Sequence, residues 1–424
     1  MTELVIANAV EVLTCARDAD DLVGRLPGAG VVVEGGRIVY VGPLGSGDLA
    51  AASTVVDATG GVVLPGFVDS HTHVVFGSSR VKEFAARAAG REPPPNAPVG
   101  IVGTAAATRA LTVSQLVAET LPRLDAMLRH GTTTVESKSG YGLRPDAELR
   151  ILEANRELDR QSPVDVVSTY LGAHAIPPGT TREAYVDAVV ELIPEIVARD
   201  LAEFCDVYCD DGFFTVAEAE RILRAGLDHG LRPKLHLDAY SATGAARLAV
   251  EVGAVSVDHL NYTPPDDVRA LATAGIRGVY LPTLELAVGH EAPLRARVLA
   301  DAGLELAVAT DVCPACWAPD LALAMALACR AGGLSVAEAI RGVTLVAADA
   351  LGRGDDIGSL EVGKRADIVV VAVPEHAHLA YRIGAIPVTH VVKDGVVVVD
   401  RTAGTGRRVT APASPARTAS EGAR

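Results

Sequence analysis

The sequence predicts an α/β protein: a (β/α)8 TIM-like barrel with a small β-sandwich domain built from both chain ends. Two observations carry this prediction. Short apolar runs alternate with longer helical stretches through the middle of the chain, and both ends consist of β-branched runs separated by Gly or Asp turns. With 424 residues and 49% hydrophobic content, the chain is long and apolar enough to bury such a core.

The two chain ends are expected to meet in one β domain made of residues 1–63 and 355–402. Near the start, VEGGRIVYVG at 33–42 is typical of a hairpin with a Gly-Gly turn. Near the end, GSLEVGKRADIVVVAV at 358–373 and VTHVVKDGVVVVD at 388–400 are again strand-like. Residues 403–424 are rich in Pro, Ala, Ser and Arg and are predicted to be a disordered tail.

Residues 64–354 are expected to form the barrel, because seven or eight strand–helix units fit into this length. Helical spacing of apolar residues predicts helices within 112–131 and 181–200. A doubly wound sheet is the rival architecture, but no GxGxxG follows the first strand. The apolar runs expected as strands include GTTTVES, VVSTYLGAH, FCDVYC, RPKLHLDA, AVSVDHL, GVYLPT and LAVATD.

Net charge and composition limit which partners and which cellular compartment we expect. A net charge of −15 argues against a nucleic-acid partner, although solubility is its simpler meaning. No apolar run reaches the roughly 20 residues that span a bilayer, so no membrane partner is expected. The start of the chain lacks a basic segment typical of export signals. We therefore expect a cytoplasmic protein whose six cysteines are reduced thiols.

Polar side chains end several of the predicted strands, beginning with His71 and His73 in PGFVDSHTHVVFG. One such histidine alone could equally be a hydrogen-bonded core residue, but the feature recurs from strand to strand. In an extended HxH pair both imidazoles point to one face and can reach one ion. Imidazole and carboxylate together suit zinc or iron, and three histidines with one aspartate leave a position for water. The further strand-end residues are His174, His236, His259 and Asp311.

Several of these segments resemble the amidohydrolase superfamily and, within it, the imidazolonepropionase family. The likeness covers about residues 3–400. The run VESKSGYGL is the most specific piece, because HxH alone marks only the superfamily. The segments that carry it are PGFVDSHTH (65–73), HTHVVFGSSRVKEF (71–84), GTTTVESKSGYGL (131–143), LGAHAIPPG (171–179), SVDHL (256–260), AVATD (307–311) and the terminal GSLEVGKRADIVVV.

The resemblance implies a role for each matching residue. The implied ligands of one divalent metal, Zn²⁺ or Fe²⁺/Fe³⁺, are His71, His73, His236 and Asp311. His259 and Asp311 would then move protons, while Arg80, Tyr141, His174 and Cys313 would contact the substrate. An Arg–Tyr pair suits a substrate carboxylate. The alternatives are that Arg80 forms a surface ion pair with Glu83 and that Tyr141 packs a turn. Lys138, the nearest candidate for a metal-bridging lysine, is not a ligand in this family.

Three departures from the family pattern lie near the expected pocket. Ala239 stands where the family usually has Glu or Gln, three residues after the third metal histidine, and the adjacent Asp238 should face the other way. TDVCPACW replaces a TD-x-N-P-G-type loop, so Cys313 and Cys316 form a CxxC. Redox chemistry, structural zinc and a covalent nucleophile are readings of this pair, but we favour thiols that line the substrate. Three prolines at 93–95 replace a segment that usually cradles the substrate.

The expected function is a metal-dependent cyclic amidohydrolase that opens a C–N bond in a small carboxylated nitrogen heterocycle. The resemblance implies 4-imidazolone-5-propanoate as substrate and N-formimidoyl-glutamate as product. The alternatives are a divergent homologue acting on another imidazolone-like, hydantoin-like or other heterocycle, and a catalytically silent binding homologue. A homodimer is expected, because barrels with one flanking β domain often pair.

Overall fold

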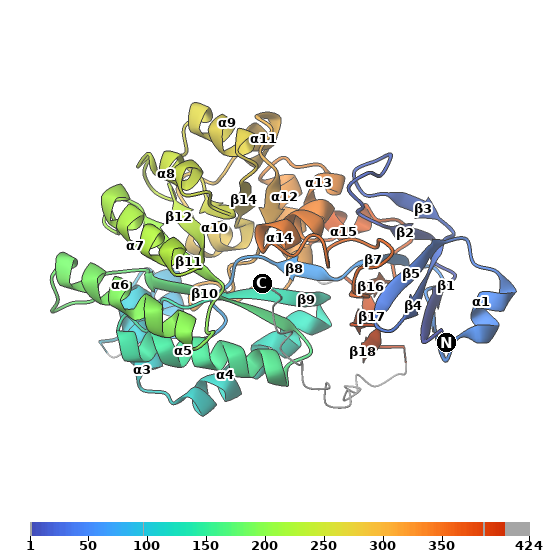
Figure 1. The fold of residues 1–424 in the computed structure, drawn as a ribbon, viewed down its shortest axis with the longest axis horizontal. Helices are drawn as coiled ribbons and strands as arrows, with labels where there is room; N and C mark the ends of the chain where they lie inside the picture. Colours follow the sequence, from blue (N-terminus) through green and yellow to red (C-terminus); the bar gives the residue numbers. More distant parts are fainter. Residues whose placement is uncertain (1, 96, 385, 403–424) are drawn as a thin grey trace.

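Eight parallel strands follow one another around a near-closed barrel in chain order, as the sequence predicts (Figure 1). The computed structural model describes residues 2–95, 97–384 and 386–402, so the tail predicted at 403–424 lies outside the described residues. Because neighbouring strands are parallel, their carboxyl ends meet at one face of the barrel. The strands are β8 (Phe67–Asp69), β9 (Thr132–Lys138), β10 (Asp165–Ala173), β11 (Phe204–Cys209), β12 (Arg232–Leu237), β13 (Ser256–His259), β14 (Arg277–Tyr280) and β15 (Leu306–Val308).

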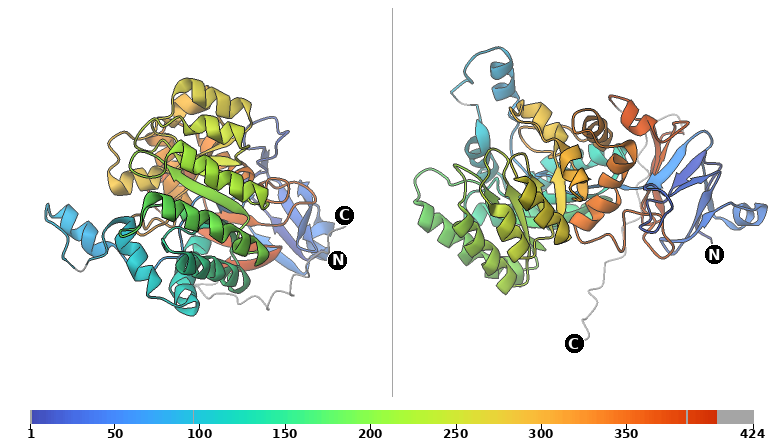
Figure 2. Two further views of the ribbon diagram at one scale, coloured as in Figure 1. Left: turned by 60° about the vertical axis from the view of Figure 1, so that its left-hand side comes forward. Right: turned by 90° about the horizontal axis from the view of Figure 1, so that it is seen from above.

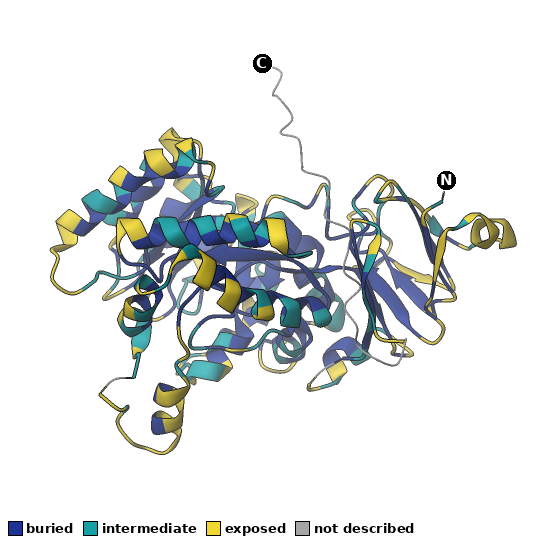
Figure 3. Ribbon diagram, turned by 90° about the horizontal axis from the view of Figure 1, so that it is seen from below, coloured by how far each residue is buried: buried dark blue, intermediate teal, exposed yellow. Residues whose placement is uncertain are grey.

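The helices between and after these strands lie outside the barrel, with exposed outer faces over buried strands (Figure 3). Capping boxes start several of them: at α4 the Thr112 side chain accepts the Gln115 backbone N–H, and Thr215 and Glu218 repeat this pattern at α7. The helices are α2 (Val81–Ala88), α3 (Gly100–Arg109), α4 (Val113–Arg129), α5 (Pro145–Gln161), α6 (Arg182–Ala198), α7 (Val216–Asp228), α8 (Ala245–Glu251), α9 (Pro265–Thr273), α10 (Pro282–Val288), α11 (Ala296–Asp301), α12 (Leu321–Arg330), α13 (Val336–Gly342) and α14 (Leu345–Ala350).

Two further sheets lie at one end of the barrel, where the blue N-terminal and red C-terminal strands run side by side (Figures 1 and 2). The predicted Gly-Gly hairpin is confirmed: β4 and β5 pair antiparallel, and Gly35 and Gly36 have φ of 57° and 72°. One sheet has the order β5-β4-β1-β6 and the other β18-β17-β16-β7-β2-β3. Their elements are β1 (Leu4–Ala7), β2 (Glu11–Leu13), β3 (Arg25–Pro27), β4 (Gly30–Glu34), β5 (Arg37–Gly42), β6 (Thr54–Asp57), β7 (Val62–Pro65), β16 (Ile368–Val371), β17 (Val388–Lys393) and β18 (Val396–Asp400), with the short helices α1 (Ser46–Ala51) and α15 (His378–Tyr381).

One apolar core joins these two sheets. Ile6 and Val33 of the four-stranded sheet belong to the same buried cluster as Val63 and Ile368 of the six-stranded sheet. Since β7 comes from the N-terminal segment and β16 from the C-terminal segment, the two chain ends share one sheet. Among the described residues, no helix combines the length and the apolar character needed to cross a membrane.

The seam between the first and last barrel strands positions the site. The Asp311 backbone N–H donates to the His71 carbonyl at 3.0 Å, and the His73 N–H donates to the Val312 carbonyl at 2.8 Å. The carboxylate of Asp69, at the end of β8, accepts the Thr310 backbone N–H at 3.0 Å. These bonds bring two segments together that lie about 240 residues apart in the chain.

Candidate metal centre

Four side chains at strand ends converge at the carboxyl-terminal face of the barrel. His71 and His73 follow β8, His236 belongs to β12, and Asp311 follows β15. The Nε2 atoms of His71 and His73 lie 3.8 and 3.9 Å from Oδ1 of Asp311. The ring centroids of His71 and His236 are 4.6 Å apart. The structure thus brings together the four residues that the sequence singles out as metal ligands.

Two overlapping groups of donor atoms in this cluster are compact enough to hold a metal ion. One consists of His71, His73 and Asp311, and the other of His71, His236 and His259. Within each group, one donor atom per residue lies within 4.8 Å of the others. His71 belongs to both groups and therefore stands at the middle of the cluster.

His71 and His73 are in the form that binds metal. Burial, together with neighbouring positive charges, lowers the pKa of His71 and of His73 well below its usual range, so both imidazoles are neutral at pH 7. Nδ1 of His73 lies 3.2 Å from the Ser139 carbonyl oxygen. Because a carbonyl oxygen only accepts, Nδ1 carries the proton there and Nε2 keeps its lone pair.

Buried donor atoms without a hydrogen-bond partner show that the residues fit a cation. In the described part of the chain, Nε2 of His71, Nε2 of His236 and Oδ1 of Asp311 are buried and have no such partner. Buried polar atoms are normally satisfied, and unsatisfied ones call for a bound group. Imidazole nitrogen with carboxylate oxygen is a donor set for zinc or iron.

Two of the proposed site residues have an unusual backbone conformation. His259 has φ of 77° and Asp311 has φ of 49°, in the left-handed region that non-glycine residues rarely adopt. Such conformations cluster at functional sites. Burial raises the pKa of the Asp311 carboxyl to about 7, although His236 nearby opposes this.

Tyr141 and His174 form one wall beside the cluster. The His174 ring stacks on His73 with centroids 5.0 Å apart and an interplanar angle of 6°. Tyr141 meets both rings edge-on, at 5.3 Å from His73 and 5.1 Å from His174. Nδ1 of His174 lies 3.0 Å from the Gly140 carbonyl oxygen, which fixes the proton on Nδ1.

A buried carboxylate anchors the loop that carries Tyr141. Glu148, near the start of α5, accepts three backbone N–H groups: Gly140 at 2.7 Å, Gly142 at 2.8 Å and Leu143 at 2.7 Å. A backbone held at three points gives Tyr141 a fixed place beside the histidines. Nothing in the sequence singled out Glu148, because its role depends on how the SGYG loop folds back onto the helix.

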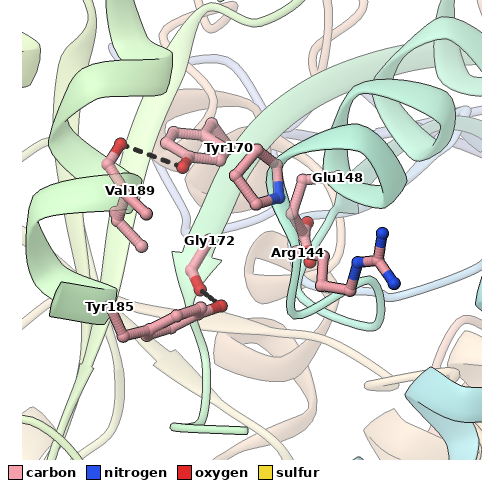
Figure 4. Close-up of a pocket in the computed structure, with 8 residues that line it drawn as sticks. Arg144, Glu148, Tyr170, Gly172, Tyr185 and Val189 are labelled. Carbon is pink, nitrogen blue, oxygen red and sulfur yellow. Dashed lines mark hydrogen bonds between the residues drawn. The ribbon is translucent and has the colours of Figure 1, made fainter. Parts of the chain in front are cut away.

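Two tyrosines beside Glu148 hold the strand that leads to His174 (Figure 4). The Tyr170 hydroxyl donates to the Val189 carbonyl at 3.1 Å, and the Tyr185 hydroxyl donates to the Gly172 carbonyl at 2.8 Å. Both bonds tie β10 to α6. They fix the end of β10 two residues before His174.

Arg80 precedes α2, and the structure shows the ion pair with Glu83 that is one of its two interpretations. Its Nε lies 2.6 Å from Oε2 of Glu83 and its Nη2 lies 2.7 Å from Oε1, a bidentate pair. The pair is largely shielded, with the Arg80 side chain 14% exposed. The ion pair with Glu83 therefore exists, and it leaves Nη1 of Arg80 outside the bidentate contact.

The two cysteines of the CPAC segment face each other across a tight turn. The Cys313 backbone N–H donates to the Cys316 carbonyl at 3.0 Å, and the Cys316 N–H donates back at 3.1 Å. Burial raises the pKa of both thiols, that of Cys313 well above its usual range. The neutral thiol is a poor nucleophile, which weakens the interpretation of Cys313 as a covalent catalyst. All six cysteines of the chain are free thiols.

Ala239 occupies the position where the family usually has an acidic side chain or Gln. Ala239 is buried, and its carbonyl accepts the Nε2–H of His290 at 2.9 Å. The Asp238 carboxylate accepts from the Thr243 backbone N–H at 2.9 Å and from the Thr263 hydroxyl at 2.8 Å. The Asp238 carboxylate is thus engaged by its own loop and by the loop after β13, and does not replace the missing Glu.

Besides Glu148, two features of the site are not predicted by the sequence. Tyr208 stacks on His259, with centroids 5.9 Å apart and an interplanar angle of 9°. Below the histidines, Lys138 lies among buried carboxylates, including those of Asp206 and Asp258. Alternation in the strands was the available signal, since Asp206 and Tyr208 share one face of FCDVYC.

Family models and full-length relatives both show that this chain is similar to amidohydrolases. Two models described as "Amidohydrolase family" match residues 54–167 and 217–398. The chain is 40% identical to an imidazolonepropionase of Shouchella clausii over 420 residues, 94% of each chain. It is 43% identical to an imidazolonepropionase of Geobacillus kaustophilus over 388 residues, 89% of this chain and 91% of the relative.

Solved structures share the fold at lower identity. A triazine hydrolase variant superposes with a TM-score of 0.72 at 20% identity, covering 96% of both chains. An adenosine deaminase of Xanthomonas campestris with bound zinc gives 0.67 at 21% identity, covering 94% of this chain and 93% of the other. At such identity these structures establish the barrel and its flanking sheets, and no substrate.

Proposed function

The chain belongs to the imidazolonepropionase family of amidohydrolases, and we propose that it hydrolyses a ring C–N bond of a small carboxylated nitrogen heterocycle. The first candidate substrate is 4-imidazolone-5-propanoate, which would give N-formimidoyl-glutamate. The observation that carries the proposal is the buried cluster of His71, His73, His236 and Asp311, in which, among the described residues, Nε2 of His71, Nε2 of His236 and Oδ1 of Asp311 have no hydrogen-bond partner.

We propose that these four side chains hold one divalent cation, zinc or iron. When bound, such an ion polarises the ring carbonyl and lowers the pKa of a water molecule so that it can attack near neutral pH. The neutral imidazoles support this assignment, because a protonated imidazole cannot bind a metal.

Proton transfer is assigned to His259 and Asp311. The His259 imidazole lies 5.3 Å from the His236 ring and 5.8 Å from the His71 ring, centroid to centroid, so it borders the centre. Burial lowers its pKa well below the usual range, so the imidazole is neutral at pH 7 and one ring nitrogen keeps a lone pair that can take a proton. In the reaction, water adds to the ring carbon, its proton passes to His259 or Asp311, and that proton then reaches the ring nitrogen as the C–N bond breaks.

Substrate binding is assigned to Arg80, Tyr141, His174 and Cys313. Arg80 and Tyr141 offer the charged donor and the hydroxyl that a carboxylate needs. His174 presents Nε2 on the same wall, since its Nδ1 is engaged with the Gly140 carbonyl. Cys313 would contribute a neutral, polarisable surface.

A different heterocycle in specialised metabolism is the second candidate, and Ala239 favours it. The methyl group of Ala239 can neither shuttle a proton nor accept a ring N–H, and its backbone carbonyl is already engaged by His290. Sites that read a heterocycle through hydrogen bonds discriminate strongly when a polar group is lost. All four proposed metal ligands are present, so the hydrolytic reaction would be retained, while the heterocycle that is hydrolysed would differ.

A direct assay separates these candidates. Purified protein is incubated with imidazolonepropionate and with a panel of hydantoins, thio-imidazolones and related lactams, and ring opening is followed by mass spectrometry. Turnover of imidazolonepropionate supports the family activity. Turnover of another ring alone retires that substrate and keeps the hydrolase. Protein that binds no metal and opens no ring would instead be the silent binding homologue.

The oligomeric state and the cellular location stay predictions. A homodimer would appear by light scattering at twice the mass of the chain. A cytoplasmic location agrees with six free thiols, because disulfides persist mainly in oxidising compartments.

A further inference from the structure

Five charged side chains form a cluster inside the barrel, beneath the proposed metal ligands. We call this the charge cluster, and its members are Glu136, Lys138, Asp206, Lys234 and Asp258. All five are almost completely buried. Buried charges are costly unless they are paired, and a barrel interior is normally filled by branched apolar residues. The substrate and proton-transfer assignments give this cluster no task.

Lys138 stands at the centre of the charge cluster. Its ammonium nitrogen lies 2.7 Å from Oδ2 of Asp206, 3.1 Å from Oδ2 of Asp258 and 3.1 Å from Oε1 of Glu136. Burial alone would lower the Lys138 pKa, but the three carboxylates together raise it well above the usual range. The ammonium is therefore a permanent internal cation.

Two of the carboxylates held by Lys138 reach the histidines above. Oδ2 of Asp258 lies 2.9 Å from Nδ1 of His71, and Oδ2 of Asp206 lies 3.1 Å from Nδ1 of His236. The ring N–H groups are not aligned well enough for these contacts to count as hydrogen bonds. Asp206 has a further anchor, because its Oδ1 accepts the backbone N–H of His236 at 3.2 Å.

These contacts give three imidazoles the same orientation. Nδ1 of His73 faces the Ser139 carbonyl, while Nδ1 of His71 and of His236 each face a carboxylate of the charge cluster. In every case Nε2 is the atom left for a metal. A carboxylate behind a metal-binding imidazole fixes its tautomer and strengthens it as a donor.

We propose that Asp258 and Asp206 are positioning residues for His71 and His236, and that Lys138 fixes both carboxylates in place. The inference rests on the metal site proposed above. The inference also gives a role to the VESK segment at 135–138, since Glu136 and Lys138 point to the same interior face of β9. The third buried group with metal-like spacing, Asp206 with His236 and Asp258, already holds a cation in the form of the Lys138 ammonium.

The test compares carboxylates that touch a histidine with one that does not. Asp258→Asn and Asp206→Asn each remove the charge behind one imidazole with little change in shape. Glu136→Gln is the matched control, because Glu136 is equally buried and contacts Lys138 and Lys234 but no proposed ligand. Each purified protein is stripped of metal, and its Zn²⁺ dissociation constant is measured by competition with a chromophoric chelator. The visible absorption of the Co²⁺-loaded protein and the melting temperature of the stripped protein are recorded as well.

We expect Asp258→Asn and Asp206→Asn each to weaken Zn²⁺ binding by about 10- to 100-fold and to shift the Co²⁺ absorption bands. Glu136→Gln should lower the melting temperature but change the Zn²⁺ dissociation constant less than about threefold. Equal affinity in the two Asp variants and the wild type would overturn the inference, and so would an equal loss in Glu136→Gln.

The design keeps the outcomes apart. The nearest carboxylate is Asp258 for His71 and Asp206 for His236, although Oδ2 of Asp258 also lies 3.7 Å from Nδ1 of His236. Either Asp variant therefore still tests the question if the other does not fold. Wild-type protein that binds neither Zn²⁺ nor Fe²⁺ contradicts the proposed function itself. Wild-type protein that binds Zn²⁺ and hydrolyses its substrate, beside Asp variants of unchanged affinity, refutes only the positioning role.

Discussion

Replacing Asp165 with asparagine probes how the barrel is held to the flanking sheets. Asp165 begins β10, and its Oδ2 lies 2.7 Å from Nη2 of Arg365 and 3.0 Å from Nζ of Lys393. Both partners belong to the C-terminal segment, so the carboxylate joins the bottom of the barrel to the shared sheet. Burial alone would raise the Asp165 pKa, but the two cations outweigh it and lower the pKa to about 2.

The size of the effect follows from this pKa. A carboxyl that falls from its ordinary value of 3.8 to about 2 stabilises the fold by about 2 kcal/mol at neutral pH. Because the folded pKa is the lower one, this stability is fully present above about pH 5. It is lost as the pH falls through about 2, and about half is gone at pH 3. With an unfolding entropy of about 2.1 cal/mol/K per residue, Asp165→Asn should lower the melting temperature by about 2–3 °C at pH 7.

The assay is thermal unfolding of metal-free wild type and Asp165→Asn at pH 7 and pH 3. Asp146→Asn is the control, because Asp146 also pairs with arginine but is half exposed; it should shift the melting temperature by less than about 1 °C. The reasoning predicts a difference at pH 7 that shrinks at pH 3. A difference of the same size at both pH values, or none at pH 7, would refute it.

Three substitutions probe the site directly. Arg80→Lys should raise KM for imidazolonepropionate by about tenfold or more with a smaller change in kcat, because lysine cannot make a bidentate contact; an unchanged KM would remove Arg80 from the carboxylate site. Cys313→Ala should keep kcat within about tenfold, since a buried neutral thiol is a poor nucleophile, and complete loss of turnover would contradict this. Ala239→Glu should raise imidazolonepropionate turnover in steady-state assays, and equal or lower turnover would mean that this position is not what limits it.

Much of the fold could be predicted from local pattern. Each apolar run proposed as a strand between 131 and 311 overlaps a barrel strand, and the two helices proposed within 112–131 and 181–200 begin and end within two residues of α4 and α6. Strand-end polarity likewise identified the histidines, because parallel strands all end at one face.

Contacts between distant strands could not be read in this way. In the sequence, Lys138 stands out only as the nearest candidate for a metal-bridging lysine, which the family resemblance argues against, since its partners Asp206 and Asp258 lie on other strands. Glu148 looks like an ordinary charge at the start of a helix until the SGYG loop is seen folding onto it. Both cases depend on contacts that form only when the chain folds. The periodicity of apolar residues in strands and helices does not encode such contacts.

The pairing of Arg80 with Glu83 shows a different limit. The sequence offered either an ion pair or a carboxylate-binding group, and the structure contains the ion pair beside the site. A bidentate partner occupies two of the donors of the guanidinium but not all five. The two interpretations are therefore compatible, and only the KM of an Arg80 variant separates them.

Metal dependence of ring hydrolysis tests the central claim most directly. Purified protein is analysed for bound metal, stripped with a chelator, assayed against imidazolonepropionate and the heterocycle panel, and assayed again after Zn²⁺ or Fe²⁺ is restored. We predict about one divalent ion per chain, hydrolysis that is lost with the metal, and recovery on its return. Full hydrolysis by the stripped protein, or no hydrolysis of any ring after metal is restored, would contradict the assignment of His71, His73, His236 and Asp311 as the centre of a cyclic amidohydrolase.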